Sequence, residues 1–339
     1  MGITKLEVKE FLFEVRNRPL LDVRSPGEYL QGHIPGSISF PLFSNEERAK
    51  VGTRYKQVGK ESAFLLGLKI VGPKMADFVK KAIRLAPDRK IAVHCWRGGQ
   101  RSGSIAWLLQ QAGFEVVVLN GGYKAYRQYI LDSLSTITFQ INVVGGKTGV
   151  GKTRVLNALS DLGEQVLDLE FLANHKGSAF GFIGELPQPT PEQFENILWD
   201  NLASLDLNRR LWVENESRSI GRVYIPEGFW KQMKLSPLFH IEIPQADRIN
   251  NLLKDYVLED TPALKIAFEK IAPKLGGLRF KQALEALDAG HFSQAAALAL
   301  EYYDKTYQHC LDQNISPQIR RLDFSHGDPH QIALMLSQL

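Results

Sequence analysis

The sequence predicts an α/β protein made of two domains, each built around a mostly parallel sheet. A chain of 339 residues exceeds the usual size of one domain. Short apolar segments of strand length alternate with longer segments of helical periodicity, which is typical of parallel α/β folds. The alternation ends near residue 130 and restarts at residue 139 with a new strand and a glycine-rich turn. Two such units in series are the simplest explanation.

The strand predictions rest on apolar runs bounded by polar or turn residues. They fall at 19–23, 90–95, 115–119, 139–146, 164–169, 210–215, 238–243 and 320–324. Helical spacing over Met75–Ala86 and Gly103–Ala112 places helices between strands of the first domain. We therefore expect a first domain over 1–130, a linker over 131–138 and a second domain over 139–339.

The second domain contains one long stretch without strand signals. From about 246 to 312 the pattern is helical and includes the alanine-rich segment FSQAAALALEYYDK. A last helix is expected after the strand at 320–324, with Ser325 or Asp328 as its cap. The second domain is therefore predicted to carry a helical insertion or layer over about 246–312 beside its sheet.

Composition excludes several classes of protein. The 44% hydrophobic and 23% charged fractions are those of a globular chain, not of a disordered one. No apolar run approaches the ~20 residues that span a bilayer, and the start MGITKLEVKEF lacks the apolar core of a signal peptide. Two cysteines, Cys95 and Cys310, are too few for a disulfide-stapled scaffold. We expect a soluble, cytoplasmic protein with no membrane partner; nothing in the sequence specifies an oligomeric state.

The formal net charge of +4 is unevenly distributed. Residues 1–135 hold 21 Lys and Arg against 12 Asp and Glu, a balance of +9, and residues 136–339 hold 20 against 25, a balance of −5. This asymmetry indicates an anionic partner of the first domain, with nucleic acid as one candidate. The alternative is a modestly basic domain whose charge serves solubility alone.

The segment HCWRGGQRSGSIAWLL is the most informative in the first domain. A strand ends at Cys95, and a glycine-bearing loop leads through Arg101 and Ser102 into a helix. The N–H groups of such a loop and helix start form an anion cradle that lowers the pKa of a thiol within it. Arg101 supplies a planar donor for an oxyanion, and Arg97 would flank the mouth. We predict that Cys95 and Arg101 are catalytic.

The second domain begins with a phosphate-binding motif. Gly146-Lys-Thr-Gly-Val-Gly-Lys152-Thr153 matches G-x-x-x-x-G-K-[ST], follows a predicted strand and precedes a predicted helix. Gly146, Gly149 and Gly151 let the backbone wrap a phosphate chain, Lys152 reaches its terminal oxygens and Thr153 is the candidate Mg²⁺ ligand. The motif does not identify the ligand, since any di- or triphosphate presents the same oxygens.

Strand ends in the second domain supply acidic candidates for this site. Asp168 ends the strand after the phosphate loop, and Glu214, followed by Glu216, ends a later one. Either strand-end carboxylate could complete a Mg²⁺ site or bind substrate. The alternative for each is a carboxylate that caps the following helix.

Two polar segments supply further candidates. His175 lies in the glycine-containing segment NHKGSAFG, and Arg218 and Arg222 lie in ESRSIGRVYIP. Each segment could contact phosphate or RNA, and each could equally be a solvated loop.

The first 125 residues resemble the rhodanese family. The resemblance is carried by the cysteine loop and by LDVRSPGEYLQGHIPGSISFPL, which includes Asp22, Arg24, Glu28, Gly32, His33, Pro35 and Gly36. In that family the cysteine carries a sulfane species in a cluster of N–H donors. The usual sulfurtransferase loop places arginine five positions after cysteine, whereas Arg101 is six after Cys95, as in dual-specificity phosphatases of the same fold. The wider loop suits a tetrahedral oxyanion better than a lone sulfur.

A rhodanese domain followed by a P-loop domain resembles the tRNA 2-selenouridine synthases. The resemblance covers essentially the whole chain, including CWRGGQRS, GGKTGVGKT, LANHKGSAFG and VENESRSIG. It implies replacement of the sulfur of wobble 2-thiouridine in tRNA by selenium from selenophosphate, through an intermediate geranylated with geranyl diphosphate. Phe180 and Phe182 are possible lining for the geranyl chain.

Two other functions are consistent with these motifs. The spacing from Cys95 to Arg101 would suit a phosphatase, although the loop offers no general acid besides Ser102. A nucleotide-regulated sulfur carrier that binds a protein partner is the second alternative, and the basic first domain argues weakly against it.

Overall fold

The computed structural model describes residues 2–256, 261–312, 316 and 318–339. The chain divides into two compact units, Met1–Ser133 and Leu134–Leu339. The division falls inside helix α7 (Gly122–Thr136). Residues 131–136, expected in a linker, are therefore the last turns of a helix, because the apolar spacing of YRQYILDSL continues past the predicted domain end.

The N-terminal unit is a parallel sheet with strand order β1-β5-β4-β2-β3. Its strands are β1 (Ile3–Leu6), β2 (Leu20–Asp22), β3 (Ile38–Ser39), β4 (Lys90–His94) and β5 (Glu115–Leu119). Its helices before α7 are α1 (Val8–Glu14), η1 (Val15–Asn17), α2 (Pro26–Gln31), α3 (Asn45–Gln57), α4 (Lys60–Val71), η2 (Gly72–Lys74), α5 (Met75–Leu85) and α6 (Gln100–Gln111). The short strands β1 and β3 and the helical hairpin α3–α4 were not predicted from the sequence.

Local sequence explains how this unit places its loops. Ser25 and Glu28 form a capping box that starts α2 directly after β2, with Pro26 in its first turn. The interior strands β4 and β5 are apolar along almost their whole length, as expected for a sheet covered on both faces. Because all strands run in parallel, the loop after β4 and the start of α7 after β5 meet at the same edge.

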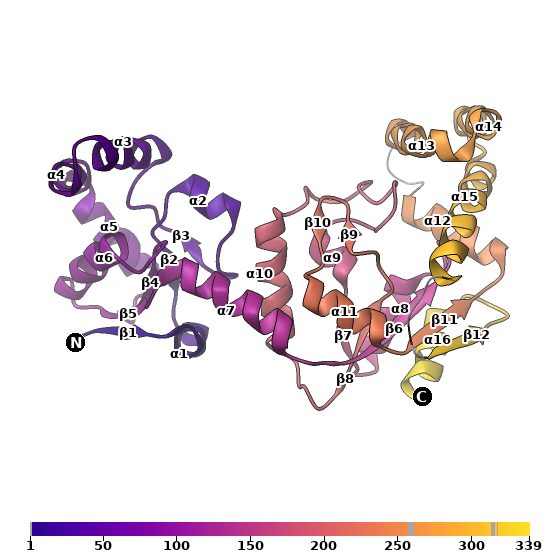
Figure 1. The fold of residues 1–339 in the computed structure, drawn as a ribbon, viewed down its shortest axis with the longest axis horizontal. Coiled ribbons are helices and arrows are strands. Elements are labelled where there is room, and N and C mark those ends of the chain that lie inside the picture. Colours follow the sequence, from indigo (N-terminus) through magenta and orange to yellow (C-terminus); the bar gives the residue numbers. More distant parts are fainter. Residues whose placement is uncertain (1, 257–260, 313–315, 317) are drawn as a thin grey trace. The chain divides into compact units, whose positions relative to one another are not determined.

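The C-terminal unit has a second parallel sheet, of order β12-β11-β6-β8-β7 (Figure 1). Its strands are β6 (Gln140–Gly146), β7 (Gln165–Leu167), β8 (Arg210–Glu214), β11 (Leu238–Glu242) and β12 (Ile319–Asp323), and a separate hairpin joins β9 (Ser219–Ile220) to β10 (Val223–Tyr224). The helices outside the 246–312 stretch are α8 (Lys152–Asp161), α9 (Leu169–Ala173), α10 (Pro191–Leu202), α11 (Glu227–Leu235) and α16 (Pro329–Ser337). Val144 of β6 pairs with Glu214 of β8, so Glu214 lies beside the start of the phosphate loop.

The helical region predicted over about 246–312 is present beside this sheet. It consists of α12 (Gln245–Tyr256), α13 (Thr261–Leu275), α14 (Gly277–Asp288) and α15 (Phe292–Asp312). Its members share an apolar core that Phe180 and Ile183 also enter, although these two belong to the loop after α9. The loop and the helical layer are therefore packed as one body beside the phosphate loop.

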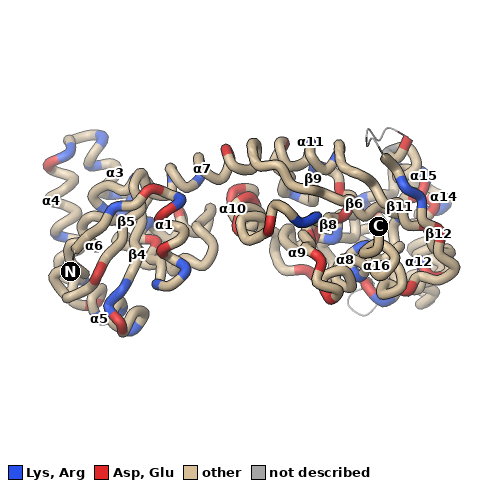
Figure 2. Tube along the Cα trace, turned by 90° about the horizontal axis from the view of Figure 1, so that it is seen from below, with Lys and Arg blue, Asp and Glu red and all other residues tan. Residues whose placement is uncertain are grey.

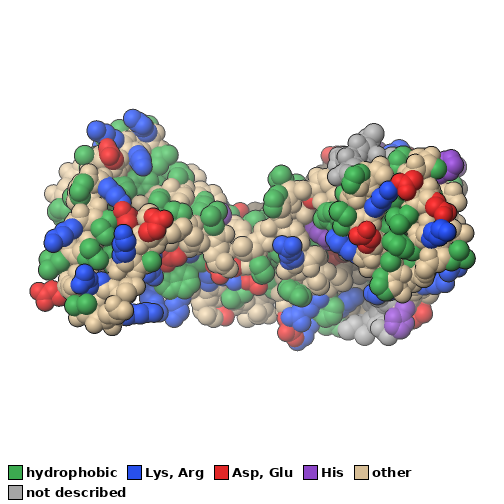
Figure 3. All heavy atoms as spheres, turned by 90° about the horizontal axis from the view of Figure 1, so that it is seen from above, with side chains coloured by type: hydrophobic (Ala, Val, Ile, Leu, Met, Phe, Trp, Pro, Cys, Tyr) green, Lys and Arg blue, Asp and Glu red, His purple; other side chains and the backbone are tan. Residues whose placement is uncertain are grey.

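On the face drawn in Figure 3, charged side chains are spread over each unit and do not form one patch. Figure 2 shows Lys and Arg on α3 and α5 of the N-terminal unit, and Figure 3 shows them scattered among hydrophobic side chains on one face. Within the part of the chain that the structure describes, no helix combines the length and apolarity needed to cross a membrane.

Candidate active site

The cysteine loop joins the end of β4 to the start of α6. Gly98 turns it with a φ of +63°, and a Cβ there would lie 2.7 Å from the Leu119 carbonyl oxygen. Cys95 is 3% exposed, and its Sγ lies 3.2 Å from the Ser102 Oγ. The Ser102 hydroxyl also donates to the Gly99 carbonyl at 3.2 Å. Because a hydroxyl has one proton, turning it from this carbonyl toward Sγ would stabilise a Cys95 thiolate.

The N-terminus of α7 holds this loop from below. The N–H of Tyr123 donates to the Cys95 carbonyl at 2.8 Å, and that of Lys124 donates to the Trp96 carbonyl at 3.0 Å. Gly122 has a φ of +63°, and a Cβ there would lie 2.3 Å from the Cys95 carbonyl oxygen. This close approach requires glycine. The role of Gly122 was missed from the sequence, although the paired glycines after strand 115–119 are its signal.

Arg101 was expected to offer its guanidinium to an oxyanion in the loop. Its Nη1 and Nη2 instead donate to the carboxylate of Glu28, at 2.6 and 3.1 Å. Burial would raise the pKa of Glu28, but Arg101, the Ser25 N–H and Arg48 together lower it to about 2. Glu28 is therefore ionised at neutral pH, and an oxyanion in the loop would compete with it for Arg101. Arg97 is exposed in the loop beside Cys95.

Beneath the loop lies a buried polar cluster. Arg24 makes an ion pair with Asp22 at 2.6 Å, donates to the Gly32 carbonyl at 2.6 Å and stacks 3.8 Å from the Tyr123 ring centroid. His94 Nε2 lies 3.6 Å from Asp22, yet burial lowers the His94 pKa to about 4 despite that carboxylate. These contacts connect the ends of β2 and β4 to α7, and so they fix the base of the cysteine loop.

The phosphate loop connects β6 to α8 and brings its predicted residues together. Gly146, Gly149 and Gly151 have φ values of +154°, +84° and +83°, a conformation that side chains with a Cβ rarely adopt. Gly151 directly precedes α8, which begins at Lys152. The N–H groups of this turn and the side chains of Lys152 and Thr153 therefore face one pocket.

Helix α12 supports the phosphate loop from outside. Arg248 Nε donates to the Thr148 carbonyl at 2.8 Å, and Asn251 Nδ2 donates to the Gly149 carbonyl at 2.9 Å. The Arg248 guanidinium is itself held by Asp304 of α15, at 2.5 and 2.9 Å. This support was missed from the sequence because it joins residues about 100 positions apart.

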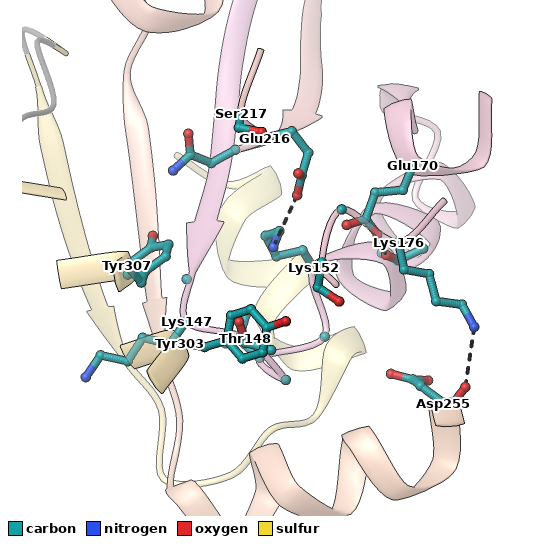
Figure 4. A pocket seen from close by; sticks show the side chains of 18 of the residues that line it. Lys147, Thr148, Lys152, Glu170, Lys176, Glu216, Ser217, Asp255, Tyr303 and Tyr307 are labelled. Atoms are coloured by element: carbon teal, nitrogen blue, oxygen red, sulfur yellow. Dashed lines mark hydrogen bonds and ion pairs between the residues drawn. The ribbon is translucent and has the colours of Figure 1, made fainter. Parts of the chain in front are cut away.

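Carboxylates face the two reactive side chains of the loop (Figure 4). Lys152 Nζ lies 3.6 Å from Glu216 Oε1, and the Thr153 hydroxyl donates to Glu170 Oε2 at 3.3 Å. The Glu170 N–H donates in turn to Glu214 Oε1 at 2.9 Å, behind the pocket. The structure thus brings the predicted Glu214 and Glu216 to the phosphate loop.

Burial raises the pKa of three carboxyl groups here, those of Glu170, Glu214 and Asp168. Burial, and then the Glu216 charge, raise the pKa of Glu170 to about 8 against the opposing effect of Lys152. Burial raises the pKa of Glu214 well above its usual value and raises that of Asp168 as well. Asp168 lines the pocket and also accepts the Phe171 N–H at 2.8 Å, so it caps α9 as the alternative interpretation required. Glu170 was missed from the sequence, although it stands two residues after Asp168.

Only some residues of the polar segments NHKGSAFG and ESRSIGRVYIP line the pocket. Lys176 lines it, with Nζ 3.3 Å from Glu185 and donating to the Ile183 and Asp255 carbonyls. The predicted His175 packs instead against Gly181, whose Cβ position lies 2.8 Å from its ring.

The two predicted arginines of the next segment also separate. Arg218 lines the pocket beside Ser217. Arg222 lies in the turn between β9 and β10, where its N–H donates to Gln188 Oε1 at 2.8 Å. The pocket therefore receives Arg218 alone of the pair.

The pocket over the phosphate loop has a volume of about 1060 Å³ and adjoins an apolar cavity. The residues common to both linings are Thr148, Ser178, Leu252, Tyr256 and Tyr303. The cavity continues among apolar side chains of α12–α15 together with Phe180: Leu253, Leu264, Phe268, Leu287, Phe292, Ala295, Ala296, Ala299 and Leu300. The pocket over the phosphate loop and the apolar cavity therefore share one wall.

Family comparisons divide the chain as the fold does. Residues 4–129 match the rhodanese-like domain, and residues 139–287 match the domain described as the tRNA 2-selenouridine synthase AAA domain. The N-terminal unit is also similar to the N-terminal domain of a protein described as ATP/GTP-binding from Clostridium difficile 630, with 41% identity and a TM-score of 0.36 over 38% of this chain and 99% of that one.

Curated relatives extend the similarity over nearly the whole chain. The tRNA 2-selenouridine synthase of Nitrosomonas europaea is 38% identical over 251 residues, which span 72% of this chain and 65% of that protein. The tRNA 2-selenouridine synthase of Hydrogenovibrio crunogenus is 34% identical over 364 residues, which span 96% of each chain.

Proposed function

The chain belongs to the family of tRNA 2-selenouridine synthases, and on this basis we propose that it modifies tRNA in two steps. In the first step it transfers a geranyl group from geranyl diphosphate to the sulfur of wobble 2-thiouridine. In the second step it replaces the geranylated sulfur with selenium from selenophosphate. The protein is then a transferase with a P-loop site for the first reaction and a cysteine loop for the second.

The observation that carries this proposal is the shared wall between the phosphate pocket and the apolar cavity. A ligand that fills both spaces has a phosphorylated end and a hydrocarbon end. Geranyl diphosphate has this form, whereas the polar sugar and base of a nucleotide would gain little from walls of Leu, Phe and Ala. The phosphate loop is therefore assigned to an allylic diphosphate.

The two phenylalanines proposed for the geranyl chain occupy different positions. Phe180 lines the apolar cavity and meets the Phe268 ring edge-on at 5.1 Å. The ring of Phe182 instead has Lys270 Nζ 3.9 Å from its centroid. We retain Phe180 as a contact of the geranyl chain and replace Phe182 by Phe268 from α13.

The residues beside the phosphate loop fit a Mg²⁺ ion. In the described part of the chain, no three or more His, Cys, Asp or Glu side chains are grouped as a metal site. Mg²⁺ commonly binds through one or two protein oxygens together with substrate phosphates and water. Thr153 and Glu170 present such oxygens, and Glu214 adds a buried Oε2 that has no hydrogen-bond partner among the described residues. Bound there, Mg²⁺ would neutralise charge on the diphosphate.

In the proposed first step, a sulfur–carbon bond forms at the allylic carbon and the carbon–oxygen bond to the diphosphate breaks. The bonding electrons leave with the diphosphate, and the uridine loses its N3 proton as the C2–S bond becomes single. Lys152 and the N–H groups of the phosphate loop offset the charge that develops on the leaving group. The Lys152–Glu216 pair is loose at 3.6 Å, so the diphosphate can take over Lys152.

In the proposed second step, selenium attacks C2 of the base and geranylthiol leaves with a proton, while water releases the phosphoryl group as phosphate. Selenophosphate would be held by the N–H groups of the cysteine loop and by Arg97 or Arg101. Cys95 either carries selenium or orients it as a thiolate. Arg101 takes part only when the oxyanion displaces Glu28.

The test uses a wobble-thiolated anticodon stem-loop RNA and mass analysis of its nucleosides. With geranyl diphosphate alone the purified protein should give the S-geranyl nucleoside, and added selenophosphate should convert it to 2-selenouridine. Citronellyl diphosphate is the matched control, since it has the same number of carbons and the same diphosphate on a non-allylic carbon. Selenium incorporation without any geranylated product would contradict the two-step scheme, and loss of 2-selenouridine on gene deletion tests the function in cells.

A further inference from the structure

One side of the phosphate pocket differs in chemistry from the side that carries Glu170 and Glu216 and from the side that opens toward the apolar residues of α12–α15. It is formed by the chain after β8 and by helix α11. Apart from Glu216, which faces Lys152, the pocket-lining side chains of these segments are a neutral amide and hydroxyl, two cations and an indole: Asn215, Ser217, Arg218, Lys234 and Trp230. The proposed reaction assigns no role to these side chains.

The side chains of α11 are arranged around Trp230. Lys234 stands one helical turn later, with its Nζ 5.6 Å from the indole centroid. Glu227 stands one turn earlier and lies 3.8 Å from Arg218. Trp230 thus lines the pocket together with two cations, Lys234 from α11 itself and Arg218 from the segment after β8.

The Trp230 ring is half-buried, and its Nε1 has no hydrogen-bond partner among the described residues. A buried indole N–H normally finds a partner. The indole N–H is therefore free to donate to a ligand that enters the pocket.

We propose that the target nucleotide of the RNA stacks on Trp230, with Arg218 and Lys234 binding the neighbouring phosphates. This inference rests on the proposed function, because it names the subsite for the base that the reaction alkylates. Single-stranded RNA is recognised by stacking of splayed-out bases on aromatic rings and by cations along the backbone. An enzyme that alters a base must also take that base out of its stack.

Trp230 lies in the pocket where the proposed geranyl transfer takes place. The base must approach the carbon attached to the diphosphate, and Trp230 lines the same pocket as Lys152 and Thr153. The apolar cavity is already assigned to the hydrocarbon, and the Glu216 carboxylate is paired with Lys152 at 3.6 Å. Asn215 and Ser217 remain as neutral donors and acceptors for the edge of a uracil ring.

The experiment measures three quantities for each variant with a wobble-thiolated anticodon stem-loop: the Kd for the RNA without geranyl diphosphate, KM and kcat for geranylation, and the Kd for geranyl diphosphate. Trp230→Ala should raise the RNA Kd and KM roughly tenfold to a hundredfold and leave the geranyl diphosphate Kd unchanged. Trp230→Phe keeps a stacking surface without the N–H and should restore most of the binding.

Lys234→Ala has a matched control on the same helix. Lys231 is 64% exposed, pairs with Glu227 at 2.7 Å and does not line the pocket. Lys234→Ala should lower the slope of log Kd for RNA against log salt by about 0.7, whereas Lys231→Ala should not change it. Equal slopes for the two variants would overturn the phosphate contact.

Two results would overturn the stacking subsite. One is a Trp230→Ala protein with an unaltered melting transition and an unaltered RNA Kd. The other is a loss of nucleoside triphosphate or geranyl diphosphate binding in Trp230→Ala without any loss of RNA binding. Because the RNA Kd is measured without geranyl diphosphate, failure of the geranylation reaction itself would leave this test intact.

Discussion

The two loops that carry the proposed chemistry share one plan and differ in how they are supported. Each follows a parallel strand, turns on glycines and leads into a helix. The cysteine loop is bonded through its own carbonyls to α7, and its thiol is almost fully buried. The phosphate loop is held from outside by Arg248 and Asn251 of α12, and its inner side faces a pocket of about 1060 Å³.

This difference in support indicates a difference in ligand. A loop whose thiol is only 3% exposed admits a small ligand such as selenophosphate, so it suits delivery of selenium. The phosphate loop is held by α12 on the side away from its pocket. The pocket therefore has room for a long substrate and for the RNA base that reacts with it. If the comparison is right, substitutions in one loop should stop one reaction and spare the other.

The largest expected effect is that of Cys95→Ser. The variant should abolish selenium incorporation, because a hydroxyl supplies no thiolate at neutral pH, and should leave geranylation and RNA binding nearly intact. Nucleoside mass analysis with separate geranylation and selenation assays checks this, and an unchanged melting transition excludes misfolding. Selenouridine made by Cys95→Ser would remove Cys95 from the chemistry.

Lys152→Ala should have the converse effect. It should slow geranyl transfer about 100- to 1000-fold, because Lys152 neutralises a leaving diphosphate, and should spare selenation of RNA geranylated beforehand. Lys147→Ala is the comparison within the same loop: its side chain points away from Lys152 and Glu216 (Figure 4), so its effect should be much smaller. If Lys152→Ala slowed geranyl transfer and selenation equally, the two reactions would not be assigned to separate loops.

A smaller effect is expected at the Arg101–Glu28 pair. Arg101→Lys keeps the charge but loses the two-point contact, which should reduce selenophosphate use by about 1–3 kcal/mol, or roughly 5- to 150-fold. Thiosulfate sulfurtransferase activity should be low and little altered. Glu28→Gln decides how Arg101 acts: if Arg101 binds the oxyanion, releasing it from Glu28 should spare or improve selenophosphate use. Equal losses in both variants would instead assign the ion pair a role in positioning the loop.

Sequence reasoning was most successful where function depends on consecutive residues. The positions of most of the longer strands, the cysteine loop and the phosphate loop could each be predicted from one short segment. The rhodanese-like and P-loop-like fold class was confirmed by the family comparisons. The supports of the loops depend on residues distant in sequence, such as Glu28 for Arg101 or Arg248 for Thr148, and no local pattern announces those pairs.

The same limit explains the other misses. Residues 131–136 continue helix α7 across the unit boundary, and no change of composition marks that boundary. Glu170 and Trp230 become site residues only when α9 and α11 are placed beside the phosphate loop. The apolar cavity likewise requires α12–α15 to pack around Phe180, so single residues such as Phe182 could not be assigned to it in advance.

The smallest expected effect is on the pH dependence of the free energy of unfolding. It is tested at two carboxyl groups of the C-terminal unit, those of Glu170 and Glu164. The pKa of Glu170 is raised to about 8 by burial and by Glu216, so the folded state retains a proton that the unfolded state releases above about pH 4.5. That contribution is complete below the unfolded pKa and is lost as the pH rises to about 8. Glu170→Gln mimics the protonated form and should raise stability at pH 8 by about 1–2 kcal/mol, a gain that disappears toward pH 5.

Glu164 provides a control of opposite sign. Its hydrogen bond from Arg210 lowers its pKa, so its contribution is present above the unfolded pKa and is lost as the pH falls. Glu164→Gln should therefore lower stability at pH 8 and do less at low pH. Thermal unfolding from pH 5 to pH 8 checks both, with shifts of roughly 2–8 °C expected for the C-terminal unit. If Glu170→Gln also destabilised at pH 8, the carboxylate would be ionised and held by Lys152, and the pocket would be poised for a cation before any diphosphate arrives.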